Sequence, residues 1–179
     1  MPDIIHCHDW HTALAPAYVQ AFRDQGLRTP ATVFSIHNLA YQGLFPYETF
    51  SKLGLPDTYF GIHGLEYFGQ VSYMKAALQF SDRITTVSPS YAREILTEEQ
   101  GCGLDGLLRE RAHLLSGILN GVDYQLWDPA NDPLLPKPFD AKRLAGKSAV
   151  KKALQKKLGL AVRPDALVFG VVSRLTAQK

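Results

Sequence analysis

The sequence predicts an α/β protein in which parallel strands form a sheet with helices on both of its faces. Short apolar runs alternate along the chain with longer segments whose apolar residues recur every three or four positions. This alternation is typical of parallel sheets, because each parallel pair needs a crossover that is usually a helix. Polar residues follow each apolar run, at the strand ends where such sheets bind their ligands.

In the first half of the chain, three strands and two helices are expected. Apolar runs at residues 3–7, 31–36 and 84–87 predict strands. Residues 14–22 place their apolar side chains on one helical face, which predicts a helix between the first two strands. The same spacing at residues 70–80 predicts a helix before the third strand.

In the middle of the chain, two helices and a fourth strand are expected. Ser88 is followed by proline, and this pair is typical of a helix start, so residues 91–96 are expected to be helical. A second helix is predicted at residues 104–113, after a glycine-broken loop. Residues 117–119 read as a short strand that the turn pair Asn120-Gly121 ends.

The last part of the chain has a different composition. Residues 128–140 contain four prolines, which exclude a regular helix or sheet and predict an extended crossing segment. A basic helix is expected at residues 141–158 and a fifth strand at residues 166–172. The net charge is −7 over residues 1–135 and +9 over residues 136–179, which suggests two regions with different surroundings.

Composition excludes several classes of protein. In 179 residues, 46% are hydrophobic and 20% charged, which favours a packed core over disorder. No apolar run is long enough to cross a bilayer, and no secretory leader follows Met1, so no membrane partner is expected. Two cysteines cannot form a disulfide scaffold, which favours a reducing, cytoplasmic location.

Polar side chains follow all five expected strands. Their positions are Asp9, His37-Asn38, Ser88, Asn120 and Arg174. Together they predict a polar ligand at one edge of the sheet, where the imidazole of His37 suits hydroxyl recognition or proton handling. The alternative is that Asp9 caps a helix and the histidines are structural.

The other charged or metal-ligating groups have competing interpretations. Residues 6–11 hold five potential metal ligands, but neighbours in an extended run point to opposite faces, so no metal site is expected. Arg174 and Lys179 flank a strand-to-helix turn and suit a diphosphate, although they are also consistent with solvated charges. The lysines of residues 141–158 lie on the polar side of an amphipathic helix, so a solvated face is favoured over a nucleic-acid site.

Six ordered segments of the chain resemble the bacterial glycogen synthases, relatives of the plant starch synthases. The segments are His8-Asp9-Trp10-His11, Ile36-His37-Asn38-Leu39-Ala40-Tyr41-Gln42-Gly43, Ile62-His63-Gly64-Leu65-Glu66, Thr86-Val87-Ser88-Pro89-Ser90-Tyr91-Ala92-Arg93-Glu94, Leu119-Asn120-Gly121-Val122-Asp123 and Ser173-Arg174-Leu175-Thr176-Ala177-Gln178-Lys179.

The resemblance implies a GT-B-type retaining glycosyltransferase with two Rossmann-like halves. Such an enzyme transfers glucose from ADP-glucose to the 4-hydroxyl at the non-reducing end of an α-1,4-glucan, in glycogen biosynthesis, with no metal, cofactor or covalent nucleophile expected. Asp9 would lie on the acceptor side, His37 would face the donor glucose, and Arg174 and Lys179 would hold the diphosphate and stabilise departing ADP. The expected substrate contacts are Asn38, Tyr41, Gln42 and Asn120.

The resemblance also implies a division of the chain. Residues 1–127 would be the later part of the N-terminal, acceptor-side domain, residues 128–140 the crossing segment, and residues 141–179 the start of the nucleotide-sugar-binding domain. The chain is therefore expected to be an internal fragment, inactive alone, whose exposed sheet edges favour self-association.

Other functions stay open at this point. A non-catalytic carbohydrate- or nucleotide-binding module is one alternative. Another retaining transferase of the same architecture, such as a sucrose or trehalose-phosphate synthase relative, is a second. These residues do not separate ADP-glucose from UDP-glucose. A nucleic-acid partner is not expected, because residues 1–135 are net acidic.

Overall fold

The computed structural model describes residues 1–175. The chain divides into two compact units, Met1–Asn120 and the segment that begins at Gly121. Each unit is described by itself. The assignment of residues 1–127, 128–140 and 141–179 to parts of a larger enzyme stays a prediction.

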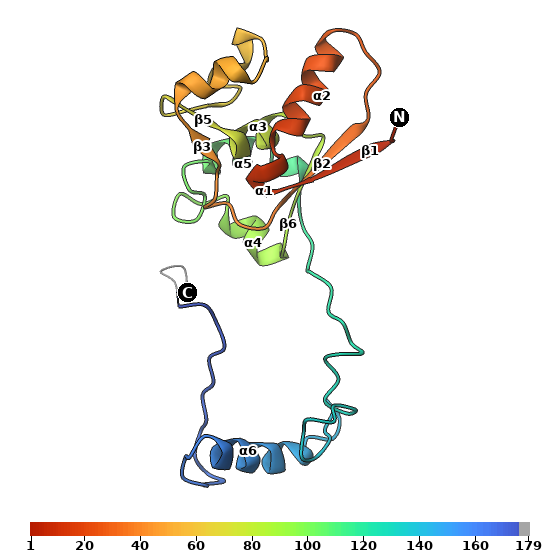
Figure 1. Ribbon diagram of the computed structural model, residues 1–179, viewed down its shortest axis with the longest axis vertical. Helices are drawn as coiled ribbons and strands as arrows, with labels where there is room; N and C mark the ends of the chain where they lie inside the picture. The colour runs from red at the N-terminus through yellow and green to blue at the C-terminus, as the bar shows by residue number, and fades with distance from the viewer. Residues whose placement is uncertain (176–179) are drawn as a thin grey trace. The chain divides into compact units, whose positions relative to one another are not determined.

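A parallel sheet forms the centre of the first unit (Figure 1). Its strands, in spatial order, are β1 (Ile4–His8), β2 (Ala31–Ile36), β6 (Arg83–Thr86) and β7 (Leu115–Gly117). All three neighbouring pairs are parallel, and the four strands lie within two residues of the predicted ones. The predicted α/β class with a parallel sheet flanked by helices is confirmed. β1 and β7 are the outer strands of this sheet, and self-association through them stays a prediction.

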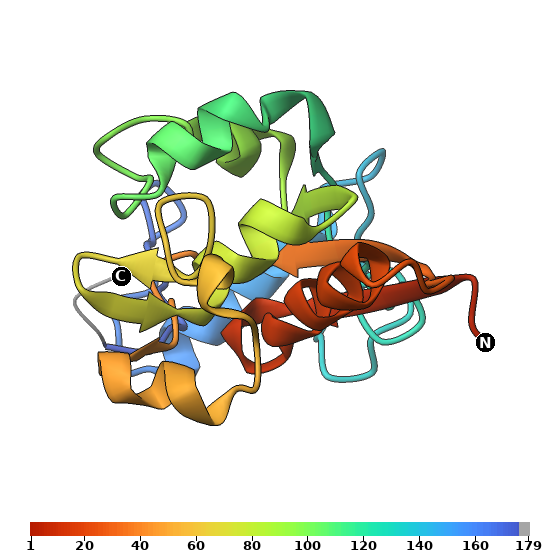
Figure 2. The ribbon, with the colours of Figure 1, turned by 90° about the horizontal axis from the view of Figure 1, so that it is seen from above.

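Five α-helices accompany this sheet. They are α1 (Asp9–Thr12), α2 (Leu14–Asp24), α3 (Tyr73–Phe80), α4 (Pro89–Glu94) and α5 (Asp105–Glu110). Ser88 Oγ accepts a hydrogen bond from the Tyr91 amide at 2.9 Å and so caps α4, as the sequence predicted. Helix α2 packs against α3 and β2, and Figure 2 shows its red coil beside the parallel sheet.

A second, antiparallel sheet was not predicted. It consists of β3 (Leu44–Phe45), β5 (Gln70–Ser72) and β4 (Glu66–Tyr67), with β5 in the middle. The helix expected from residue 70 is therefore wrong over its first three residues, because the backbone around the fully buried Val71 pairs with β3 and β4. Three 3₁₀ helices were also not predicted: η1 (Tyr47–Lys52), η2 (Asp57–Tyr59) and η3 (Ala112–Leu114).

The two faces of the parallel sheet differ in polarity. One face carries Phe34, Ile36 and Ile84, which are fully buried against apolar side chains of α3 and α5. The other face carries the side chains of β1, β2 and β6 that alternate with these. It is mostly exposed, and its polar members are His6, His8, Ser35, Arg83 and Thr85. This polar face ends at the candidate site.

The second unit has one helix in its described part, α6 (Gly146–Lys157). The expected helix at residues 141–158 starts late, because the carboxylate of Asp140 binds the amides of Lys142 and Arg143 in a turn. The strand expected at residues 166–172 is wrong. The described part of this unit offers it no strand to pair with, and Phe169 is 85% exposed. No helix within residues 1–175 is long and apolar enough to span a membrane.

Candidate functional site

The ends of β1 and β2 are joined by one carboxylate. Asp9 follows β1, and its Oδ1 accepts hydrogen bonds from the amides of His37 at 2.8 Å and Asn38 at 3.3 Å, directly after β2. Because β1 and β2 are parallel neighbours, both ends lie at the same edge of the sheet. The backbone of Asp9 is left-handed, with φ 51°, a conformation that aspartate tolerates better than most residues.

The loop after β2 is held along its whole backbone. The amides of residues 37 and 38 bind the carboxylate of Asp9, and the amide of Leu39 donates to Tyr91 Oη at 3.1 Å. The next two amides donate to the side-chain and backbone oxygens of Asn38, at 3.1 and 3.3 Å. Five consecutive donors are therefore satisfied, which fixes the loop. Burial is the main cause that raises the pKa of Tyr91, so this hydroxyl stays protonated.

Three imidazoles form a row on the polar face of the sheet. The rings of His6 and His8 lie 4.2 Å apart, and His8 Nδ1 lies 3.1 Å from His37 Nε2. At the other end, His6 Nε2 lies 2.7 Å from Ser35 Oγ, which lies 2.5 Å from Thr85 Oγ1. Burial, and after it the neighbouring His6 and His37, lower the pKa of His8, so its ring is neutral near pH 7. The hydrogen bond between His8 Nδ1 and His37 Nε2 therefore fixes the orientation of the His37 ring.

Sequence reasoning singled out Asp9 and His37 but missed two side chains that position them. The role of His8 depends on the register between β1 and β2, in which His8 lies opposite Ser35. The role of Tyr91 depends on α4 packing beside β6 and β7. A signal was present in both cases, since both residues lie in segments that carry the resemblance.

Gln42 and Tyr41 have different environments. Gln42 is only 7% exposed, and its side-chain amide donates to the carbonyl of Cys102 at 2.8 Å. Its Oε1 lies 3.5 Å from the hydroxyl of Ser72. The side chain of Gln42 therefore connects the loop to β5, through Ser72, and to the segment before α5, through Cys102. Tyr41 is exposed. Contact of either residue with a glucan stays a prediction.

The remaining candidate residues are not brought beside Asp9 by any contact described. Asn120 is exposed and lies three residues after β7, at the end of the first unit. Arg174 belongs to the second unit, and Lys179 lies outside the described residues. The roles expected for these three residues stay predictions.

The potential metal ligands of residues 6–11 do not converge. Cys7 is buried on the apolar face of the sheet, whereas His6 and His8 lie on the polar face. Within residues 1–175, no group of three or more His, Cys, Asp or Glu side chains is arranged to hold a metal ion. The two cysteines, Cys7 and Cys102, are both free.

Comparison with known proteins gives consistent results. Residues 1–110 match the family model described as the starch synthase catalytic domain. The chain is 65% identical over 178 residues to a glycogen synthase of Albidiferax ferrireducens and 56% identical over 179 residues to that of Leptothrix cholodnii. Each alignment covers 99% of this chain, and 36% and 37% of those proteins, respectively. The chain thus spans about a third of the length of these relatives.

A solved structure supports the same relationship. The catalytic domain of starch synthase IV from Arabidopsis thaliana, bound to ADP and acarbose, superposes with a TM-score of 0.72 and 41% sequence identity. The superposition covers 89% of this chain and 34% of that chain.

Proposed function

Because the chain belongs to the starch synthase catalytic domain family, we propose that it acts in a glycosyltransferase of the glycogen and starch synthase type. The reaction transfers glucose from ADP-glucose to the 4-hydroxyl at the non-reducing end of an α-1,4-glucan, with retention and without a metal. The relatives' name, glycogen synthase, supports the glucan acceptor, and the ADP bound to the Arabidopsis enzyme supports an adenine nucleotide over UDP.

The observation that carries this proposal is the fixed loop at the ends of β1 and β2. Asp9 binds two of its amides, and His8 holds Nε2 of His37. The ring of His37 is exposed at this edge, with Nδ1 outside that hydrogen bond. An imidazole held in this way can bind a sugar hydroxyl in a fixed direction, which lowers the cost of orienting the substrate. Asp9 acts through the loop and is therefore a positioning residue.

The proposed chemistry breaks the bond between glucose C1 and the diphosphate oxygen and forms a bond from C1 to the acceptor O4 on the same face. The departing ADP carries the developing negative charge, and the acceptor hydroxyl gives up its proton to the diphosphate. Arg174 and Lys179 are proposed to stabilise that charge. The proposal places the protein in the cytoplasm, and the two free cysteines support a reducing compartment.

A chimeric enzyme tests the proposal. The 179 residues replace the matching segment of the Albidiferax ferrireducens glycogen synthase, which is 65% identical. We expect the chimera to elongate glycogen from ADP-glucose, with kcat within about tenfold of the parent enzyme. His37→Ala in the chimera is expected to lower kcat by about 100-fold, the usual effect of removing one directed hydrogen-bonding group.

His113→Ala is the matched control, because His113 is an exposed histidine outside the site. It is expected to leave kcat and the melting temperature unchanged. A folded chimera without transferase activity, or a His37→Ala variant as active as the His113→Ala variant, would contradict the proposal.

A further inference from the structure

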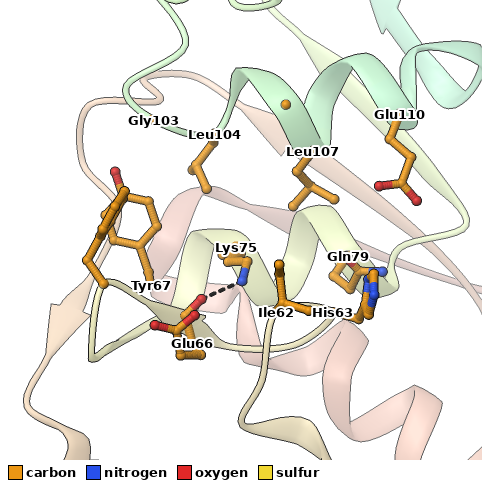
Figure 3. A pocket seen from close by; sticks show the side chains of 12 residues that line it. Ile62, His63, Glu66, Tyr67, Lys75, Gln79, Gly103, Leu104, Leu107 and Glu110 are labelled. Carbon is orange, nitrogen blue, oxygen red and sulfur yellow. Dashed lines mark hydrogen bonds between the residues drawn. The ribbon is translucent and has the colours of Figure 1, made fainter.

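A concave site lies in the first unit, apart from the loop at Asp9 and His37. It is a pocket of about 450 Å³ between α5 on one side and the β4–β5 hairpin with α3 on the other (Figure 3). This volume lies within the range of small-molecule sites in proteins. Neither Asp9 nor His37 lines it.

The two ends of this pocket differ in chemistry. Figure 3 shows Tyr67 at one end and Glu110, Gln79 and His63 gathered at the other. Leu104, directly before α5, and Leu107, on α5, point into the space between these ends. An apolar wall with a few polar groups at one end suits a ligand that has both apolar C–H faces and hydroxyl groups.

The aromatic end is fixed in position. Tyr67 Oη donates a hydrogen bond to the carbonyl of Cys102 at 2.8 Å. Gly103 makes this approach possible, since a Cβ at that position would lie 2.4 Å from Tyr67 Oη. The ring of Phe68, which also lines the pocket, stands perpendicular to that of Tyr67 at a centroid distance of 4.8 Å. The pocket therefore has an aromatic corner with one ring held by a hydrogen bond.

Phe68 adopts an unfavourable backbone conformation while its side chain is in solvent. Phe68 and Gly69 form the two-residue turn between β4 and β5, with φ of 48° and 79°. Such turns favour asparagine, aspartate or glycine at the first position, and a bulky residue there is strained. The side chain of Phe68 is 81% exposed, so it gains little from packing within the chain. Strained residues of this kind gather at ligand sites.

The charges around the pocket favour a neutral ligand. Two carboxylates, Glu66 and Glu110, line it. Lys75 is 8% exposed as a whole residue, and its ammonium donates to the backbone carbonyls of Glu66 and Gly61, so its charge is directed toward the protein. An anionic ligand would meet the two carboxylates, whereas sugar hydroxyls can donate to a carboxylate.

We propose that this pocket binds a neutral oligosaccharide, with one sugar ring on Phe68 and Tyr67 and the hydroxyls of another near Glu110 and Gln79. The bound chain is an α-1,4-glucan, held at a point separate from the loop at His37. The choice of an α-1,4-glucan rests on the proposed function; the saccharide class rests on the pocket.

Titration calorimetry of the 179-residue chain with maltoheptaose tests this inference. The decisive variant is Phe68→Asn, which removes the ring and places a residue favoured by the turn. We expect its affinity for maltoheptaose to fall at least tenfold while its melting temperature stays equal or rises. Glu110→Gln is expected to weaken binding less, because an amide still offers an acceptor oxygen.

Phe22→Ala is the matched control, because Phe22 is an exposed phenylalanine on α2 that does not line this pocket. It should leave the affinity unchanged. Unchanged affinity in a folded Phe68→Asn chain, or no measurable binding by the parent chain, would overturn the inference. The outcome is independent of the chimera's transferase activity, because that activity tests His37 and this titration tests Phe68.

Discussion

Substitutions of Asp9 separate two properties of the loop at the candidate site: the hydrogen bonds of the carboxylate and the left-handed backbone that places it. Asp9→Asn keeps an acceptor oxygen and a residue that tolerates φ 51°. Asp9→Gly removes the acceptor but fits the backbone without strain. Asp9→Ala removes the acceptor and leaves a Cβ in the left-handed region. The three variants should therefore differ in stability in a fixed order.

The magnitudes follow from the contacts of the carboxylate. A hydrogen bond to a charged group contributes about 1.5–3 kcal/mol, and Asp9 is half-buried, so its 2.8 Å bond belongs at the lower end of this range. The left-handed backbone costs an alanine about 1–2 kcal/mol. We therefore expect losses of about 0.5–1 kcal/mol for Asp9→Asn, about 1–2 for Asp9→Gly and about 2–4 for Asp9→Ala.

Urea denaturation of the 179-residue chain measures these losses, and amide hydrogen exchange at His37 and Asn38 measures the loop directly. Exchange at both amides should become faster in Asp9→Gly and Asp9→Ala to the same extent, because both lose the acceptor. Equal stability of the Gly and Ala variants would refute the backbone contribution. Unchanged exchange at His37 would refute the role of the carboxylate.

Two further predictions concern the fold around the site. The carboxylate of Asp82 accepts hydrogen bonds from both terminal nitrogens of Arg23, at 2.8 and 2.9 Å. Burial raises the pKa of Asp82, but the hydrogen bonds from Arg23 and from Thr32 on β2 outweigh burial and hold this pKa below its usual range. Because the Asp82 side chain is 39% exposed and solvent screens the pair, Asp82→Asn should cost only about 1 kcal/mol at pH 7. In urea titrations, the difference in stability from the parent should shrink as the pH falls below 3.8 through the folded pKa; a difference that does not change with pH would contradict this. Gly43→Ala should cost about 1–3 kcal/mol more than Gly26→Ala and change Trp10 fluorescence. Both glycines have positive φ, but only at Gly43 would a Cβ lie 2.6 Å from the Trp10 ring; equal losses in urea denaturation would exclude the clash.

The parallel sheet could be predicted from sequence because its two central strands, β2 and β6, are buried on at least one face and turn signals bound the strands. β2 has the bounds expected for it, and β1 is displaced by one residue. The antiparallel sheet could not be predicted, since β3 and β4 have two residues each and no periodicity can be read in so short a segment. The strand expected at residues 166–172 failed for the opposite reason: its apolar pattern is clear, but a strand also needs a partner within hydrogen-bonding distance.

At the candidate site too, the sequence pattern indicates where the residues lie, whereas their hydrogen bonds depend on contacts between strands. Polar residues after consecutive strands correctly indicated that Asp9, His37 and Asn38 lie at one edge of the sheet. Their bonding could not be read from the pattern, because it depends on register and on backbone conformation. His8, which alternates with the buried Cys7, reaches His37 only because β1 and β2 pair with His8 opposite Ser35.

The contacts of Asp9 add a second role to the one expected for it. Asp9 was expected to lie on the acceptor side, which stays a prediction, and its Oδ1 accepts hydrogen bonds from two backbone amides of this chain. Under the proposed function, Asp9 acts on the substrate through the loop that it orders, and the exposed ring of His37 is the group that the loop presents. Loss of Asp9 should thus loosen the placement of His37 without removing its chemistry, which is why the exchange rates of the loop amides, and not activity alone, distinguish positioning from contact.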